Sequence, residues 1–338
     1  MLISRKNSSY RALAGFLAGL AGTAIAASAQ DRIEFKPPPP LPSPPPAASK
    51  TFQPGPVADL LEAQIALCRR SISSGSIDGV YGAQTQAALK AFQQANYLRV
   101  NGELDYATRQ KLILTRPALT TITVQEEDLA ALHPVPGTWL EKSEMEHLGY
   151  ASILEMAAER GHAHPNLIRR LNPSVDWNEV PPGTALSIPD AAREESPVKI
   201  ATALIHLGGK TLQAYDEQGR LLMHFPCSIA QRVEKRPVGR IEVKVIATDP
   251  NYTFDPDVFP ESAEARQLKR KLMIPPGPNN PVGVAWVGLS LPGYGIHGTP
   301  EPEKVGRTES HGCFRLANWN AATFSKASWI GMPVYVEE

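Results

Sequence analysis

The hydrophobic pattern changes near residue 198, and this change constrains the fold more than any other feature. Upstream, apolar residues recur at helical spacing; downstream, they alternate with polar ones. The segment 239–248 is the clearest case, because its apolar positions are separated by polar ones that include two charges. They are the apolar Ile241, Val243, Val245 and Ala247 and the charged Glu242 and Lys244. We therefore predict a strand with one buried face and one solvated face.

Further strand-like runs surround this one, with glycine-rich turns between the first of them. They cover residues 198–207, 211–216, 221–228, 284–289, 294–297 and 334–336, and a helix is expected over 318–326. The polar segment 249–271 looks partly helical and is expected to form an insertion over one sheet edge or a lid. Together these elements predict a mostly-β sandwich or barrel with short helices, over residues 197–338.

The N-terminus has the three parts of a secretory signal. Arg5, Lys6 and Arg11 lead into an apolar run, which ends at Ala27-Ser28-Ala29. We expect residues 1–29 to be removed after Ala29 and the protein to be exported to the periplasm or cell wall; an uncleaved membrane anchor is the alternative. Residues 30–56 are rich in proline and predict a semi-rigid, extended linker.

Charge and cysteine content narrow the possible functions. Acidic and basic residues balance at 34 each, so no strong field favours nucleic acid as a partner. Three cysteines cannot all pair in an oxidising compartment. Cys68 lies on an apolar helical face and Cys227 in a strand-like run, so both are expected to serve packing. Cys313 is left as the candidate for chemistry.

Residues 57–115 contain one motif twice. An Asp-Gly or Asn-Gly turn is followed by a Thr and then a Leu at the same offsets, starting from Asp78 and from Asn101. Both dipeptides favour turns, and the segments after them are helical. The stretch 76–93 resembles the peptidoglycan-binding domain of wall hydrolases, which implies a small three-helix module that binds the wall.

Residues 118–190 predict a strand, two helices and a strand. The region closes with Asn172-Pro173 and with the run Pro182-Gly183-Thr184-Ala185-Leu186-Ser187-Ile188-Pro189, and it resembles a LysM glycan-binding module of βααβ order. Residues 126–149 depart from that pattern because they delay the first helix. Sugar binding and a purely structural spacer both remain open for this module.

A nucleophilic thiol is the chemistry that Cys313 suggests. A free thiol has a pKa of about 8.5, and a neighbouring imidazole can lower it, so the cysteine needs a histidine. His297 ends a predicted strand and His311 lies two residues before the cysteine. We favour His297 as the base and His311 as a positioning group. Amides near Gly312 could stabilise an oxyanion, and the fork of Arg315 suits a carboxylate.

These residues resemble the signature of the L,D-transpeptidase catalytic domain. The matching runs are Ile296-His297-Gly298-Thr299 and Ser310-His311-Gly312-Cys313-Phe314-Arg315-Leu316. The resemblance implies that Cys313 attacks the bond between meso-diaminopimelate and D-Ala in a peptidoglycan tetrapeptide stem. The thioester then passes to an amine of a second stem or of a wall-attached lipoprotein.

The same resemblance assigns further roles. A backbone carbonyl near Gly298 orients His297, Ser310 and Asn318 join Arg315 in binding substrate, and carbapenems acylate Cys313. It implies no cofactor and no metal.

Four other interpretations remain open. The chain could be a hydrolase of the same fold, an L,D-carboxypeptidase or amidase in which water accepts the acyl group. It could be a wall-binding protein without activity. His297, His311 and Cys313 could hold a catalytic zinc. They could also be core residues of a binding protein.

Overall fold

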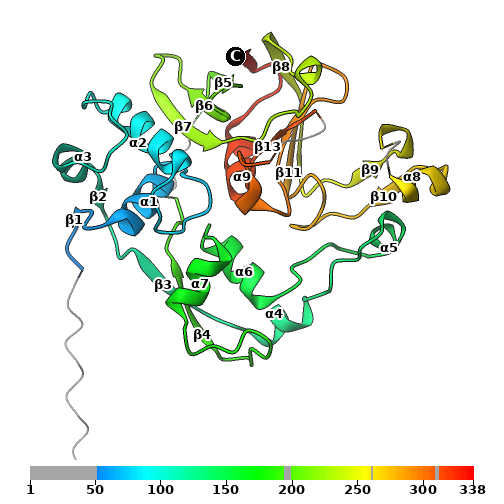
Figure 1. Cartoon of the computed structure of the whole chain (residues 1–338), viewed down its shortest axis with the longest axis horizontal. Coiled ribbons are helices and arrows are strands. Elements are labelled where there is room, and N and C mark those ends of the chain that lie inside the picture. The colour runs from blue at the N-terminus through cyan, green and yellow to red at the C-terminus, as the bar shows by residue number, and fades with distance from the viewer. Residues whose placement is uncertain (1–51, 194–198, 260–261, 309–311) are drawn as a thin grey trace, which may run out of the picture. The chain divides into compact units, whose positions relative to one another are not determined.

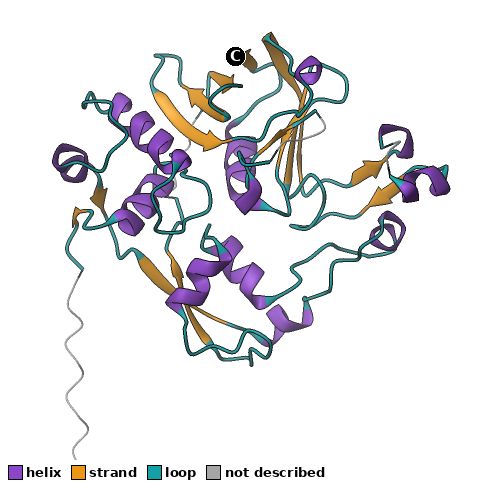
Figure 2. Ribbon diagram, in the orientation of Figure 1, coloured by secondary structure: helices purple, strands orange, loops and turns teal. Residues whose placement is uncertain are grey.

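The structure is a computed structural model that describes residues 52–193, 199–259, 262–308 and 312–338. The expected signal sequence and most of the proline-rich linker lie outside these ranges. The described chain contains a first module, a central module and a C-terminal module. Figure 2 shows that helices dominate the first module and strands the C-terminal one.

The first module has the three predicted helices, and a short strand pair that was not predicted closes it. Its elements are β1 (Gly55–Pro56), α1 (Leu60–Arg69), α2 (Ala83–Ala95), α3 (Tyr106–Lys111) and β2 (Ile113–Leu114). Strand β1 pairs antiparallel with β2. The folded module therefore begins at Gly55, just inside the range expected for the linker.

A buried glutamine holds each of the two repeated turns of the first module. Gln64 donates to the side chain of Asp78 and accepts from the Gly79 amide at 2.7 Å. Gln93 donates to the side chain of Asn101 at 2.7 Å and accepts from the Gly102 amide at 2.8 Å. Each glutamine also reaches the threonine of its own repeat. The repeat in the sequence is therefore a repeat of hydrogen bonding.

The central module has the βααβ order with two extra helices. Its elements are β3 (Leu119–Thr123), α4 (Glu126–Ala130), α5 (Trp139–Ser143), α6 (Ile153–Arg160), α7 (Pro165–Leu171) and β4 (Ala185–Pro189). Strands β3 and β4 pair antiparallel, and α6 and α7 pack against them over a shared apolar core. The insertion at residues 126–149 is the segment that carries α4 and α5 (Figure 1).

An eight-stranded sheet organises the C-terminal module, in the order β13-β12-β11-β8-β14-β5-β6-β7. Its strands are β5 (Thr202–His206), β6 (Thr211–Tyr215), β7 (Leu221–Pro226), β8 (Gly239–Thr248), β11 (Ala285–Leu289), β12 (Gly295–His297), β13 (Phe314–Arg315) and β14 (Pro333–Glu337). Helix α9 (Asn318–Ala327) packs its Phe324 into the core that these strands enclose. Cys227 is part of this core, as expected.

The two ends of the sheet meet. Ser228, just after β7, forms an antiparallel bridge with Arg315 of β13, with amide-to-carbonyl distances of 2.9 and 3.0 Å. The first module covers another part of the same outer edge of β7, because Ile72 bridges His224. The sheet is therefore a closed, barrel-like layer and not two separate sheets.

Strand β8 has the predicted bounds, but its alternation breaks in the middle. Val243 pairs with Leu289 and Val245 with Gly288, so Lys244 is an extra residue. Such a bulge moves the following side chains to the opposite faces. Val245 is 51% exposed, contrary to our expectation, and Ile246 packs against the core instead.

The polar insertion at residues 249–271 forms most of a separate two-stranded hairpin. The second strand of this hairpin begins directly after the insertion. The hairpin consists of β9 (Tyr252–Phe254), the turn η2 (Pro256–Val258), α8 (Ala263–Leu268) and β10 (Leu272–Ile274). The hairpin packs against α5 of the central module. Trp139 stacks on Phe254 with ring centroids 4.3 Å apart, and Leu148 belongs to the same apolar cluster. The two insertions therefore pack against each other.

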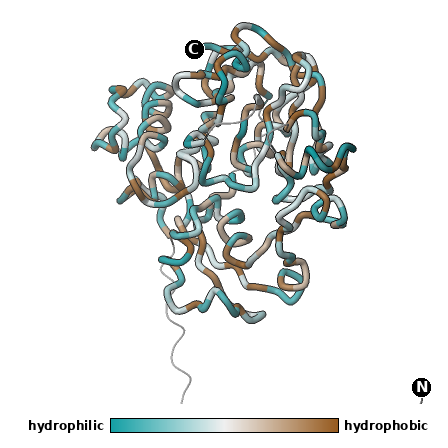
Figure 3. The backbone as a smooth tube through the Cα atoms, turned by 45° about the vertical axis from the view of Figure 1, so that its right-hand side comes forward, coloured by the Kyte–Doolittle hydropathy of each residue, from teal (hydrophilic) through white to brown (hydrophobic). Residues whose placement is uncertain are grey.

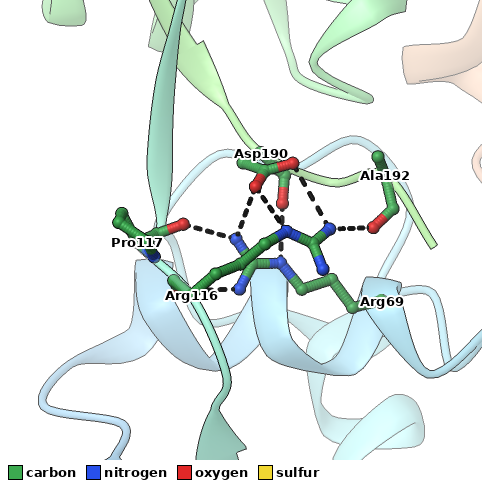
Figure 4. Close-up of polar contacts among 5 residues, drawn as sticks. All are labelled: Arg69, Arg116, Pro117, Asp190 and Ala192. Atoms are coloured by element: carbon green, nitrogen blue, oxygen red, sulfur yellow. Dashed lines mark hydrogen bonds and ion pairs between the residues drawn. The ribbon is translucent and has the colours of Figure 1, made fainter. Parts of the chain in front are cut away.

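Arg69 joins the first module to the central one (Figure 4). Its side chain is 3% exposed and donates to the carbonyls of Asp190, Arg116 and Pro117. The carboxylate of Asp190 pairs with Arg69 at 3.3 Å and with Arg116 at 2.5 Å. A buried guanidinium needs such a complete set of acceptors, since burial removes its water.

Apolar residues are interspersed with polar ones throughout all three modules (Figure 3). Within the described residues, no helix combines the length and the apolar character that crossing a bilayer requires.

Gln93→Leu should destabilise the first module by about 2–4 kcal/mol, because it leaves the amides of Asn101 and Gly102 buried without their acceptor. Calorimetry of the whole chain should show the affected transition at lower temperature. Gln94→Leu is the control, since Gln94 is exposed on the same helix and its replacement should change little. Equal melting of the two variants would contradict the role of Gln93.

Candidate active site

Two neighbouring strands bring the predicted histidine and cysteine to one face of the sheet. Strands β12 and β13 run parallel, and His297 is the register partner of Arg315. Side chains alternate between faces along a strand, so Cys313, two residues before Arg315, lies on the face of His297. Ile296 and Phe314 point the other way, into the core. His297, Cys313 and Arg315 all line one cavity.

The imidazole of His297 is fixed by a hydrogen bond and a stacking contact. Its Nδ1 lies 2.6 Å from the carbonyl oxygen of Gly298, and only a protonated Nδ1 can donate there. The other nitrogen, Nε2, is then the one able to take a proton. Trp286 of β11, the register partner of His297, stacks on the ring at 5.5 Å between centroids.

Burial decides the protonation of the pair at rest. It lowers the pKa of His297 to about 4, against the opposing effect of the Gly298 hydrogen bond and with a further decrease from Arg315. Burial also raises the pKa of the Cys313 thiol above its usual value, although Gly295 and Arg315 favour the thiolate. We expected a neighbouring imidazole to lower the thiol pKa. The structure instead has a neutral thiol and a neutral imidazole in the same cavity.

The backbone around Cys313 is close to the loop that precedes β12. The Sγ atom lies 3.4 Å from the Gly293 carbonyl oxygen. Arg315 is partly buried, and burial lowers its pKa below the ordinary value, with Glu301 acting in the opposite direction. The site therefore combines a thiol, a neutral base and a guanidinium in one enclosure.

The cavity has a volume of about 840 Å³ and a largely aromatic wall. Four lining residues form one row across four adjacent strands: Ala247, Trp286, His297 and Arg315. Ala247 reaches this row because of the bulge at Lys244. The other side of the cavity comes from the insertion at residues 249–271, through Tyr252 and Phe259 among others.

Trp139 also lines the cavity, although it belongs to the central module. One sign of this is visible in the sequence, since residues 126–149 interrupt the LysM-like pattern, but the pattern does not indicate what the interruption does. The aromatic residues Trp139, Tyr252, Phe259, Trp286 and Tyr294 were all missing from the predicted site.

Asn318 is not a substrate contact, contrary to our expectation. It is 2% exposed and absent from the cavity wall. Its Oδ1 accepts from the Thr299 amide at 3.0 Å, and its Nδ2 donates to Glu159 at 2.8 Å and to the Pro278 carbonyl at 3.1 Å. The side-chain amide of Asn318 makes all of these hydrogen bonds within the protein, which gives Asn318 a structural role near His297.

Gly312 lines the cavity beside Cys313, so its backbone is within the site. Ser310 and His311 lie outside the described residues. His311 is also the third ligand in the alternative interpretation of a zinc site. Among the residues that the structure does describe, no group of three or more His, Cys, Asp or Glu side chains could hold a metal ion.

Comparison with protein-family models identifies the domains. Residues 201–336 match the L,D-transpeptidase catalytic domain, and residues 57–112 match the domain described as "Putative peptidoglycan binding domain". The C-terminal module is therefore an L,D-transpeptidase catalytic domain, and the first module is a peptidoglycan-binding domain that precedes it. The chain is therefore an enzyme that carries an L,D-transpeptidase catalytic domain.

Individual relatives match different shares of the chain. "Putative L,D-transpeptidase YkuD" of Bacillus licheniformis is 28% identical over 148 residues, which are 44% of this chain and 70% of the relative. "Putative L,D-transpeptidase in ATP synthase subunits region ORF 5" of Fuscovulum blasticum is 32% identical over 38% of this chain, and the chain spans 64% of its length. The crystal structure of an L,D-transpeptidase from Xylanimonas cellulosilytica is similar over 87% of this chain and 100% of its own, at 15% identity and a TM-score of 0.35.

The imidazole of His297 should stay neutral down to about pH 4, because burial disfavours its cation. Unfolded histidine protonates near pH 6.5, so the unfolded chain binds more protons between these values, and the contribution of His297 to stability falls as pH falls from 6.5 to 4. NMR titration of the histidine ring carbons, assigned with His297→Asn, measures this. A midpoint near 6.5 would contradict the buried, neutral state.

Proposed function

We propose that this protein is a peptidoglycan L,D-transpeptidase with Cys313 as the nucleophile and His297 as its base. The single observation that carries the proposal is the placement of both side chains on one wall of the same cavity, with the Nδ1–H of His297 bound to Gly298. A thiol whose pKa is raised needs a base at the moment of attack, and a neutral imidazole supplies one.

The reaction balances with these groups alone. The Sγ of Cys313 attacks the carbonyl carbon between the L-centre of meso-diaminopimelate and D-Ala, while the thiol proton moves to Nε2 of His297. The tetrahedral intermediate collapses, the C–N bond breaks, and the imidazolium returns the proton to the departing amine of D-Ala. An acceptor amine then attacks the thioester, loses its proton to His297, and releases the thiol.

The other residues of the site would bind the negative charges of the substrate and of the tetrahedral intermediate, or would position the reacting groups. Arg315 lies in the register position next to His297 and suits a carboxylate of the donor stem, since its planar fork can bind two oxygens. Backbone amides near Gly312 would stabilise the oxyanion, and the loss of one such donor typically costs about 2.7–4 kcal/mol of barrier. His311 would position the thiol and Ser310 the substrate.

The acceptor in this proposal is an amine of a second stem peptide. A wall-attached lipoprotein would use the same chemistry, and water would make the enzyme an L,D-carboxypeptidase. Several aromatic residues line the cavity, and they would limit the access of water to the thioester. This favours an amine of a peptide over water.

The rest of the chain serves delivery to the wall. A signal sequence at residues 1–29, cleaved after Ala29, would export the protein to the periplasm, and the proline-rich linker at residues 30–56 would act as a spacer. The first module would bind peptidoglycan. The central module, with its LysM-like order, would contact glycan, although its α4–α5 insertion already contributes to the catalytic cavity.

Cys313→Ala and His297→Ala should each abolish acyl transfer with little change in the folding of the module. The wild-type enzyme, incubated with tetrapeptide muropeptides, should give cross-linked dimers and free D-Ala by mass spectrometry. Undiminished turnover by Cys313→Ala would refute the assignment of the nucleophile, and tripeptide without dimers would favour the hydrolase.

Imipenem, a carbapenem, should add to Cys313 and to neither Cys68 nor Cys227, which are buried.

The full chain carrying Cys313→Ala should pellet with purified sacculi, because the variant cannot modify them and the first module would hold it there. Quantifying the protein in pellet and supernatant, with serum albumin as the control, measures this. Protein that stays in the supernatant at all concentrations of sacculi would contradict wall binding.

A further inference from the structure

Helix α6 of the central module contacts the catalytic domain through two carboxylates one turn apart. Glu155 accepts from Nδ2 of Asn279 at 2.6 Å, and Glu159 accepts from Nδ2 of Asn318 at 2.8 Å. The two contacts are chemically alike, but the two asparagines have different further partners. Asn279 only ties neighbouring loops together, since its Nδ2 also reaches the Gly149 carbonyl. Asn318 leads to the catalytic histidine.

Asn318 opens helix α9 and lies behind the strand that ends in His297. Its Oδ1 accepts from the Thr299 amide at 3.0 Å. That N–H belongs to the same peptide unit as the Gly298 carbonyl, which accepts the Nδ1–H of His297 at 2.6 Å. A peptide unit is planar and rigid, so holding its N–H also fixes the direction of its C=O. Asn318 therefore sets the orientation of the group that orients the imidazole.

The packing around this peptide leaves it no freedom to shift. A Cβ atom added to Gly298 would lie 2.2 Å from Oδ1 of Asn318, and one added to Gly283 would lie 2.0 Å from the same oxygen. Only glycine fits at both positions. The side chain of Asn318 is thus wedged between two backbone segments, and Glu159 holds its other end.

We propose that Glu159 is a positioning residue for acyl transfer: through Asn318 and the Gly298–Thr299 peptide it fixes the imidazole of His297. The central module thereby completes the catalytic centre of another module. This role rests on the proposed function of Cys313 and His297. Glu159 itself touches neither the thiol nor the cavity.

The charge of Glu159 adds a test. Burial raises its pKa to about 7; the Asn318 hydrogen bond lowers it, and the carboxylates of Glu155 and Glu303 raise it. Tyr150 is the other titratable group that interacts with it. A carboxylate accepts a stronger hydrogen bond than a neutral acid does. The contact with Asn318 should therefore tighten as the pH rises through neutrality.

The experiment measures the rate of Cys313 acylation by imipenem in the full chain, by intact mass, for the wild type and three variants. Glu159→Ala should slow acylation about tenfold or more, because Asn318 loses the acceptor that holds it. Glu159→Gln keeps an oxygen acceptor and should restore much of the rate. Glu155→Ala, which removes the matching contact one turn earlier, should remain within twofold of the wild type.

The pH dependence separates positioning from folding. Neutral glutamic acid and glutamine are nearly isosteric, so the ratio of the wild-type rate to the Glu159→Gln rate should be near one at pH 5.5. It should increase towards pH 8, where the wild type is ionised. A loss of stability alone would not give a ratio that follows this titration. If Glu159→Ala does not fold, the ratio of the wild-type rate to the Glu159→Gln rate still tests the positioning role of Glu159.

Three results would overturn the inference. They are a folded Glu159→Ala with a rate within twofold of the wild type, a Glu155→Ala that is slowed equally, and a pH-independent ratio for Glu159→Gln. A wild type that imipenem leaves unmodified would contradict the proposed function instead. In that case the same comparison is made with iodoacetamide, which needs only the thiol and its base and so still tests the positioning role.

Discussion

The parallel pairing of β12 with β13 is the constraint on which the catalytic centre depends. It is only a few residues long, yet it fixes which residues share a face, so that His297 and Arg315 line the cavity while Ile296 and Phe314 fill the core. The bridge between Ser228 and Arg315 holds β13 from its other side. A short strand, secured on both flanks, can present a nucleophile with little freedom, which is what an acyl-transfer site requires.

The three modules are less separable than their sequence families suggest. The aromatic contact between Trp139 and Phe254 makes the central module part of the cavity wall, and the contact between Glu159 and Asn318 extends it to the base. Arg69 joins the first module to the central one through acceptors in the central module and in the connector between the two. The cavity wall and the contacts behind His297 therefore involve the central module as well as the last 140 or so residues.

The sequence predicted local structure and chemistry well and long-range contacts poorly. The bounds of β8 and the repeated turns of the first module follow from periodicity and spacing, which are local properties. The exposure of Val245 could not be foreseen, because it depends on a bulge against another strand. The role of Asn318 was misjudged and Trp139 was missed for the same reason, which is that their partners are distant in the sequence. Glu159 lies 159 residues from Asn318, and Trp139 stacks on Phe254 of another module.

The bridge between Ile72 and His224 covers part of the outer edge of β7. Strand β7 ends the sheet order, and an unpaired outer strand is a template on which other chains can add. The loop after α1 occupies part of this strand, with Ser73 donating to the His224 carbonyl at 2.7 Å and His224 donating to the Ser71 carbonyl at 2.9 Å. The peptidoglycan-binding domain thus shields its neighbour from self-association, a duty unrelated to any affinity for the wall.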